Sequence, residues 1–467
     1  MTGGMLGLVL DAVGIRALLS VNTAGLPRIG ANGAGVHMDW RVLLFTLIVA
    51  LGTGIVFGLI PALTSSRTDL AATFNEGSAR SGSGFRQNKA RSLFIITEIA
   101  LALILLIGSA LLIRTDVALA RVEPGFDAHD VLTMRMSLTG QRWATTASVA
   151  QAIRDGVQRV EAIPGVEVAS ATCCVPLQGG FGLPFTIAGR PLTTGPYTGG
   201  ASWGTVSPGY FEVFKIPVIR GRTFTDRDDA QATPVAIINE AMARQFWPKE
   251  NPIGAHITIG RGVMKEFATE PERQVIGIVG DTRDAGLNSD PGPRMFTPQA
   301  QSPDGVNALN SGISPLAWVV RTRTPPLQLS SRIQAALTGA TGLPVSSIEP
   351  MDQVVQGSTS RQRFNMWLMS VFGASALVLA AIGIYGLMAY TVEQRTPEIG
   401  IRMALGAEGA SVTNMVVAQG MRMALIGVLV GVAASFGLTR LIASFLFGVQ
   451  PYDPLVFVGV PLILASV

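Results

Sequence analysis

The chain has 467 residues, of which 48% are hydrophobic and only 14% are charged, and its formal net charge is +4. A soluble chain carries about 25% charged residues. The shortage of charged residues here is confined to a few stretches, and the middle of the chain has an ordinary composition. This pattern excludes disorder and indicates a membrane protein with a soluble insert. The basic excess does not indicate nucleic-acid binding, because the sequence has no basic cluster with interleaved aromatic residues.

The N-terminal segment does not read as a cleavable signal peptide. It lacks a basic start, and Asp11 and Arg16 interrupt its apolar run. We interpret it as the end of a membrane helix whose beginning is missing.

Membrane spans are the next feature along the chain. A span needs about 20 predominantly apolar residues, and four stretches meet this requirement. In the fourth, Arg440 lies close enough to one end to snorkel to the interface. The predicted spans are 43–63, 93–113, 366–390 and 423–447, and a partial one begins at 455 and stops at 467.

The short loops predict the orientation of these spans. The Gly/Ser-rich linker 66–92 is basic, which places it in the cytoplasm. The span 93–113 then leads outward and 366–390 leads back, so residues 114–363 lie outside the cytoplasm. The loop that follows Tyr390 is cytoplasmic again.

The soluble insert, residues 114–363, contains two predicted β-α-β units. Alternating and helical apolar spacing predicts strand, helix and strand from 131 to 175, and the same order returns from 316 to 351. We expect the units to pack together in a porter-like part, residues 125–199 and 313–352. Residues 200–312 predict a β-rich subdomain with one helix near 240–247. The expected fold is thus a transmembrane helical bundle with a large α+β extracytoplasmic domain.

Two adjacent cysteines, Cys173 and Cys174, cannot supply a disulfide framework. They read as two small residues in a buried strand or, alternatively, as a strained vicinal disulfide.

A weak internal repeat is also present. The segment 14–20 is followed by Asp39 and an apolar run, and 437–444 is followed by Asp453 and another apolar run. Either the likeness is chance, or the chain holds the tail of one membrane unit and most of a second.

Motifs for catalysis, metals and nucleotides are missing from this sequence. The histidines His37, His129 and His256 have no metal-ligand spacing, and H-E-x-x-H, C-x-x-C and G-x-S-x-G do not occur. None of the lysines follows a glycine, so no Walker motif is present and no cofactor is expected. These lysines are Lys89, Lys215, Lys249 and Lys265.

Small and charged residues within the spans carry further predictions. The pairs Gly54/Gly58 and Gly427/Gly431 have the spacing of close helix packing. Glu98 is an ionisable residue inside a span and so a functional candidate. It lies about one and a half turns from the start of the span, however, and an interfacial or interhelical contact is the favoured interpretation.

The cytoplasmic loop after Tyr390 predicts a short, separate helix. Thr396 suits an N-cap, Pro397 the first helical position, and Gly406 a stop. A helix of this kind suits either a plain interfacial role or docking into a partner's groove. Its charged stripe is Arg395, Glu398 and Arg402, and its apolar side chains include Ile399, Ile401 and Leu405.

This loop, EQRTPEIGIRMALGA, resembles the signature of MacB/FtsX-type ABC transporter permeases. SPGYFEVFKIPVIRGRTFTDRDD, PVAIINEAMARQFWPKENPIG and VIGIVGDTRDAGL resemble the MacB-type periplasmic core domain, and RSLFIITEIALALILLIGSALLIR with VEPGFD resembles the span and domain start before it. The resemblance covers most of residues 90–450. It is greatest to the duplicated variety, which has two such units and no fused ATPase.

The resemblance implies a division of the chain and a set of partners. Residues 1–65 would end a first permease unit, 93–113 and 364–467 would belong to a second one truncated in its last span, and the segment 395–407 would be the coupling helix that receives force from a cytoplasmic ABC ATPase. A periplasmic adaptor or outer-membrane component is a further implied partner, and the inner membrane the implied location.

The implied function is that of a non-enzymatic permease subunit acting by mechanotransmission, for export or extraction of a lipid, peptide or drug-like substrate. The alternative is an FtsX-like regulator whose external domain activates an envelope hydrolase. A membrane-bound enzyme is disfavoured because the sequence has no catalytic constellation.

Overall fold

The computed structural model describes residues 40–65, 83–192, 195–405 and 409–466. It divides into two units: a helical unit, Met1–Arg121 with Ser360–Val467, and an α+β unit, Val122–Thr359. The N-terminal partial span, the first copy of the weak repeat at 14–20 and most of the linker 66–92 lie outside the described residues.

The helical unit consists of long apolar helices. Among the described residues, three stretches are long and apolar enough to cross a membrane: Ser92–Ala120, Ser360–Tyr390 and Thr413–Phe445. They coincide with three of the four predicted spans, although those from Ser360 and Thr413 begin earlier than expected. The fourth, 43–63, lies within α2, where the described apolar stretch is Trp40–Gly52. The helices are α2 (Trp40–Ser65), α3 (Ser83–Ala120), α10 (Ser360–Ala404), α11 (Gly409–Ile442), the 3₁₀ turn η6 (Ala443–Phe445) and α12 (Pro454–Ser466).

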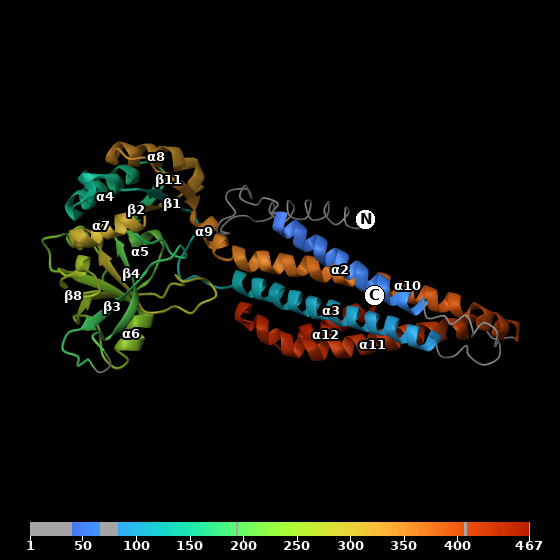
Figure 1. Ribbon diagram of the computed structural model, residues 1–467. Coiled ribbons are helices and arrows are strands. Elements are labelled where there is room, and N and C mark those ends of the chain that lie inside the picture. Colours follow the sequence, from blue (N-terminus) through green and yellow to red (C-terminus); the bar gives the residue numbers. More distant parts are fainter. Residues whose placement is uncertain (1–39, 66–82, 193–194, 406–408, 467) are drawn as a thin grey trace. The chain divides into compact units, whose positions relative to one another are not determined.

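Helix α3 is the centre of this unit. Helix α10 runs along one side of it and α11 and α12 along the other (Figure 1). Ile99, Leu103, Ile107 and Leu111 are buried at four-residue spacing, which puts them on one face of the helix. Apolar side chains on the outer faces, such as Val378 and Leu429, remain exposed. This inversion of the soluble pattern is expected where the surrounding solvent is hydrocarbon.

The α+β unit begins with a four-stranded antiparallel sheet in the order β11-β1-β10-β2. Each β-α-β unit contributes two parallel strands that the other unit separates, which is the split β-α-β arrangement. The prediction that the two units pack together is confirmed. The elements are β1 (Val131–Met136), the 3₁₀ turn η3 (Gln141–Trp143), α4 (Thr146–Glu161), β2 (Val166–Thr172), β10 (Leu316–Thr322), α8 (Pro326–Thr341), β11 (Ser346–Pro350) and α9 (Met351–Ser358).

The core of this sheet forms around Trp318, which is fully buried beneath α4 and α8. A Cβ atom built on Gly156 of α4 would lie 2.3 Å from the Trp318 ring, so α4 can approach the sheet only because residue 156 has no side chain. Helix α4 begins at an N-cap, Thr145, whose hydroxyl accepts the Ser148 N–H.

The second part of the unit is a closed six-stranded barrel, β4-β3-β7-β8-β6-β9, and a parallel β4–β9 pairing closes it. Strand β3 pairs with β4 and β7, so the barrel begins near residue 181 and not at the predicted 200. Two further helices were not predicted in this part, α5 and α7. The elements are β3 (Phe181–Ile187), β4 (Gly199–Val206), α5 (Tyr210–Val213), β5 (Val218–Gly221), β6 (Val235–Asn239), α6 (Glu240–Phe246), β7 (His256–Ile259), η4 (Lys265–Phe267), β8 (Glu272–Val279), β9 (Arg294–Pro298), η5 (Gln299–Gln301) and α7 (Asp304–Ile313).

An aromatic cluster joins the sheet to the barrel. Tyr210, Phe211 and Phe214 of α5 and its C-cap are buried together with Phe296 of β9. The Phe211 and Phe296 rings lie edge to face with centroids 5.1 Å apart. Such pairs add to the energy of area burial, and the cluster around them combines buried side chains from both the sheet and the barrel.

Candidate functional site

The predicted coupling segment is the end of a single long helix. Helix α10 runs without interruption for 45 residues, from Ser360 to Ala404, and extends beyond the apolar stretch that ends at Tyr390. At 1.5 Å per residue, this extension reaches about 20 Å past the span. Ile401 and Leu405 are 64% and 82% exposed. Four residues apart, they form an apolar surface at this end.

The expected helix start at Thr396 is wrong. Thr396 lies inside α10, and its hydroxyl donates to the Val392 carbonyl at 3.0 Å. A threonine at this place bonds back to the turn before it instead of capping a new one. Pro397, which has no N–H to donate, continues the same helix without the bond to residue 393. The expected stop, Gly406, lies outside the described residues. Of Arg395, Glu398 and Arg402 the structure describes only the backbone, which places all three on α10.

Glu98 lies at the interface between α3 and α10. A Cβ atom built on Gly383 would be 2.5 Å from the Glu98 Oε2 atom, so the glycine leaves room for the carboxylate. The side chain is half-buried. Sequence reasoning gave an interhelical contact as one possibility but not Gly383, because the two residues are far apart in the chain.

The predicted glycine pairs differ from each other. Gly427 and Gly431 both face α3: a Cβ on Gly427 would lie 2.8 Å from Ile99 Cβ, and one on Gly431 would lie 3.0 Å from the Ala100 carbonyl oxygen. A Cβ on Gly54 meets no atom of the described residues within 4 Å. The surroundings of Gly58 are not among those that the structure describes.

Ion pairs link the C-terminal end of α3 to α10 and to the residue before α12, and the sequence did not predict them. Arg114 of α3 pairs with Asp453, which precedes α12. Asp116 of α3 pairs with Arg363 of α10 at 3.4 Å. About two turns further along both helices, the hydroxyls of Ser109 and Ser370 lie 3.0 Å apart. The last two contacts join α3 to α10 near the ends at which both helices continue into the α+β unit.

A buried arginine holds the start of the α+β unit. Arg321 of β10 is 2% exposed and donates to the carbonyls of Val213, His129 and Asp127 at 2.6, 2.9 and 2.8 Å. The Asp127 carboxylate also accepts from Lys215 at 2.9 Å. Partial burial alone would raise the pKa of Asp127, but the hydrogen bonds from Lys215 and the His129 N–H and the charge of Arg321 lower it below its ordinary value.

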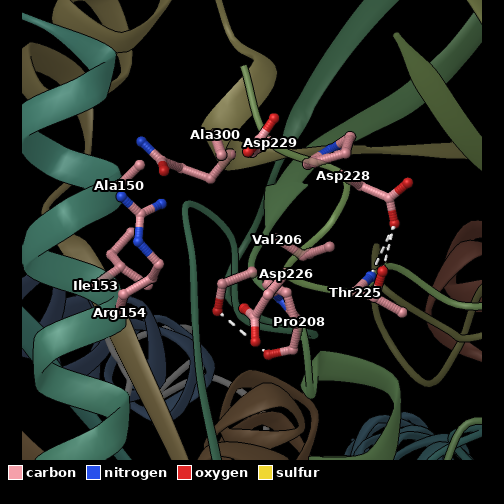
Figure 2. A pocket seen from close by; sticks show the side chains of 13 residues that line it. Ala150, Ile153, Arg154, Val206, Pro208, Thr225, Asp226, Asp228, Asp229 and Ala300 are labelled. Atoms are coloured by element: carbon pink, nitrogen blue, oxygen red, sulfur yellow. Dashed lines mark hydrogen bonds between the residues drawn. The ribbon is translucent and has the colours of Figure 1, made fainter. Parts of the chain in front are cut away.

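A groove runs between α4 and the barrel. Figure 2 shows Ile153 and Arg154 of α4 on one side and Pro208 and Asp226 on the other. The same four residues line an adjoining hollow of about 410 Å³. Asp228, which also lines the groove, accepts two hydrogen bonds from Arg222, at 2.7 and 2.8 Å.

The groove is lined by polar and charged side chains together with a few apolar ones. Its charges are one guanidinium and several carboxylates, and its lining residues include no histidine, cysteine or lysine. Within the described part of the chain, no three His, Cys, Asp or Glu side chains are grouped as metal ligands.

Comparison with known families decides the identity. Residues 42–340 match the MacB-like periplasmic core domain, and residues 370–467 match the FtsX-like permease C-terminal domain. The chain belongs to the MacB/FtsX-type ABC transporter permeases. The permease is therefore a membrane protein with a periplasmic core domain, and its matched domains are transport components that include no catalytic domain.

Several curated proteins are similar to the permease over half of its length. The macrolide export ATP-binding/permease protein MacB of Marinobacter nauticus is 26% identical over 231 residues, which cover 49% of this chain and 34% of that protein. The probable syringafactin export ATP-binding/permease protein SyfD of Pseudomonas syringae is 26% identical over 241 residues, which cover 51% of this chain and 34% of that protein. The pyoverdine export ATP-binding/permease protein PvdT of Pseudomonas aeruginosa is 25% identical over 224 residues, which cover 48% of this chain and 32% of that protein. The permease thus spans about a third of the length of these relatives.

Solved structures also resemble it. The periplasmic region of MacB from Actinobacillus actinomycetemcomitans is 14% identical, with a TM-score of 0.33 over 50% of this chain and 93% of that one. The extracellular domain of the transporter YknZ is 17% identical, with a TM-score of 0.30, and the match covers 47% of this chain and 99% of that one.

Proposed function

We propose that the chain is the permease subunit of an ABC export system and couples ATP hydrolysis by a separate cytoplasmic ATPase to movement of the α+β unit. The observation that carries this proposal is the continuity of α10. One helix of 45 residues, about 68 Å long at 1.5 Å per residue, begins at Ser360, directly after the α+β unit, and ends at the exposed Ile401–Leu405 surface. A continuous helix transmits displacement along its axis.

The packing of α3 against α10 supports the same mechanism. The α+β unit is connected to the membrane by only two chain crossings, at the end of α3 and the start of α10. Contacts between the two helices hold them in register: Glu98 with Gly383, Ser109 with Ser370, and Asp116 with Arg363. A movement of α10 at its cytoplasmic end would therefore reach both connections of the α+β unit together.

The remaining parts of the proposal concern partners and substrate. The relatives combine an ATP-binding part and a permease part by name, whereas these 467 residues contain no Walker motif, which favours an ATPase partner. Their names give different exported compounds, and we propose export or extraction of a lipid, peptide or drug-like substrate. A periplasmic adaptor or outer-membrane component, and a duplicated, two-unit arrangement of the whole protein, belong to the same proposal.

The decisive experiment is charge reversal in the coupling segment. We expect the tagged, full chain to co-purify with an ABC ATPase and to stimulate its ATP hydrolysis. Arg402→Glu and Glu398→Arg should each abolish most of the stimulation while membrane insertion is unchanged. The matched control is Arg332→Glu, an exposed charge reversal on α8, which should leave stimulation intact. Full stimulation in both coupling variants would show that the assignment is wrong.

A further inference from the structure

The two cysteines form a close pair at the end of β2. The strand ends at Thr172, so Cys173 and Cys174 lie just beyond it and not within it as predicted. Both thiols are free, and the residues are only 6% and 5% exposed. Their Sγ atoms are 2.7 Å apart, not far from the bonding distance of about 2.05 Å. Two thiols that meet in this way are one step from a disulfide.

The surroundings favour the thiolate of Cys173. Its Sγ atom accepts the Thr205 N–H at 3.3 Å. A Cβ built on Gly204 would lie 3.8 Å from this sulfur and 3.7 Å from the Arg294 guanidinium, so both groups flank the same glycine. Burial alone would raise the pKa of Cys173, but the contact with Cys174, the Thr205 hydrogen bonds and the charge of Arg294 lower it. The pKa of Cys174 is raised by its neighbour and by burial.

Polar groups beside the pair lack partners. The Tyr210 hydroxyl and the Arg294 Nε atom are buried and make no hydrogen bond with any other residue that the structure describes. Arg294 pairs instead through another nitrogen with Asp284. Buried polar groups are satisfied in the great majority of cases, so orphaned ones beside two reactive sulfurs indicate that this cluster has a role besides packing.

We propose that Cys173 and Cys174 are a redox site that forms a reversible vicinal disulfide in the oxidising compartment outside the cytoplasm. Disulfides form and persist in such compartments, and the core domain is periplasmic. The oxidant is a disulfide of a small thiol or of a thiol oxidoreductase.

The reaction is an ordinary pair of exchange steps. The Cys173 thiolate attacks one sulfur of the oxidant, whose other sulfur leaves as a thiol after taking up a proton. Cys174 then loses its proton and attacks the Cys173 sulfur, which releases the second thiol. Two electrons and two protons pass to the oxidant in total. Because both residues are buried, the exchange takes place during folding or local opening.

The position of the pair gives the bond a structural consequence. Strands β2 and β4 pair only at Thr172 and Val206, and the Cys173 N–H donates to the Thr205 carbonyl at 3.2 Å. This is where the four-stranded sheet continues into the barrel. A disulfide would constrain that junction and remove the thiolate from Thr205 and Arg294.

Mass spectrometry of the full-length protein tests the proposal. Protein from membranes is denatured with N-ethylmaleimide, once without reductant and once after reduction. We expect the peptide holding both cysteines to be unlabelled and two hydrogens lighter in the first sample, and doubly labelled in the second. Two labels without reductant, even after incubation with oxidised glutathione, would overturn the proposal. So would protection that occurs only as a glutathione adduct or as an intermolecular dimer on a non-reducing gel.

Single variants provide the matched controls. Cys173→Ser and Cys174→Ser each keep one thiol and cannot form the internal bond. Each should take one label without reductant. If both single variants were protected to the same extent as the wild-type chain, protection would not require the pair, and the assignment would fail.

Discussion

The carboxylate of Glu98 on α3 lies against the backbone of Gly383 on α10, within the membrane-spanning part of both helices. The pair explains why a span tolerates an acidic residue: the facing helix has a glycine where any other residue would occupy the carboxylate's place. It also makes the α3–α10 contact sensitive to a single methyl-sized change.

We therefore predict that Gly383→Val destabilises the helical unit. Its side chain would displace the Glu98 carboxylate, the flexible end of a half-buried side chain, or separate the helices, so we expect a small cost of about 1 kcal/mol. The measurement is thermal unfolding in detergent. Gly386→Val on the same helix is the control, since a Cβ there meets no described atom within 4 Å. Glu98→Ala should restore part of the loss, and no difference between the two valine variants would contradict the contact.

A second prediction concerns the packing of α11 on α3. A Cβ on Gly431 would approach the Ala100 backbone at 3.0 Å, and a backbone oxygen cannot move aside as a side chain can. Gly431→Val should therefore lower the melting temperature of the solubilised protein by several degrees, and Gly437→Val, where no described atom lies within 4 Å, should not. Equal melting temperatures would mean that α11 does not approach α3 so closely.

Much of the fold follows from local sequence patterns, and these were predictable. Long apolar runs with at most one charged residue predicted three helices of the described residues that can span a membrane, and alternating or helical spacing predicted both β-α-β units. The features that could not be predicted depend on distant partners. The barrel closes through β4 and β9, which are parallel and far apart in the chain, and no local pattern specifies such a pairing.

The site residues divide in the same way. Exposed apolar residues such as Leu405 were identified from helical spacing. The start of the coupling segment was wrong because Thr396 has the composition of a cap, whereas the preceding span already continued as helix. The ion pair between Arg114 and Asp453 was not predicted, because a contact between residues more than 300 positions apart has no signature in one sequence.

The third prediction is that Arg321→Ala destabilises the α+β unit. The guanidinium donates to the carbonyls of Val213, His129 and Asp127, and its removal leaves the carbonyl of the buried Val213 without this donor. We expect a loss of about 1–3 kcal/mol, the range for a buried acceptor that loses its donor, in denaturant unfolding of the full chain. Arg323→Ala, at an exposed position two residues along, should cost less than about 0.5 kcal/mol. A similar loss in both variants would refute the anchoring role.

The fourth prediction is a dependence of stability on pH. Burial alone would raise the pKa of Asp228, but its hydrogen bonds from Arg222 and Thr225 lower it below the ordinary value of 3.8. A lowered carboxyl pKa adds stability that is present above the unfolded value and is lost as pH falls through the folded one. Arg222 is half exposed, so we expect Asp228→Asn to cost about 1 kcal/mol at neutral pH. The difference from the wild type should disappear in acid. A difference that stayed constant down to pH 3 would contradict it.

The last prediction tests whether α10 acts as one continuous helix. One alanine inserted after Val392 rotates every later residue by about 100° and moves it by about 1.5 Å. Ile401 and Leu405 would then face a different direction, although the span and its packing on α3 stay unchanged. We expect the insertion to abolish most stimulation of the partner ATPase while the melting temperature of the solubilised chain is preserved. Thr396→Ala is the control, since it removes only the hydroxyl bond to Val392 and leaves the helical register intact. If the insertion variant stimulated ATP hydrolysis as well as Thr396→Ala does, the direction in which Ile401 and Leu405 face would not matter for coupling, and the proposed role of a continuous α10 would be wrong.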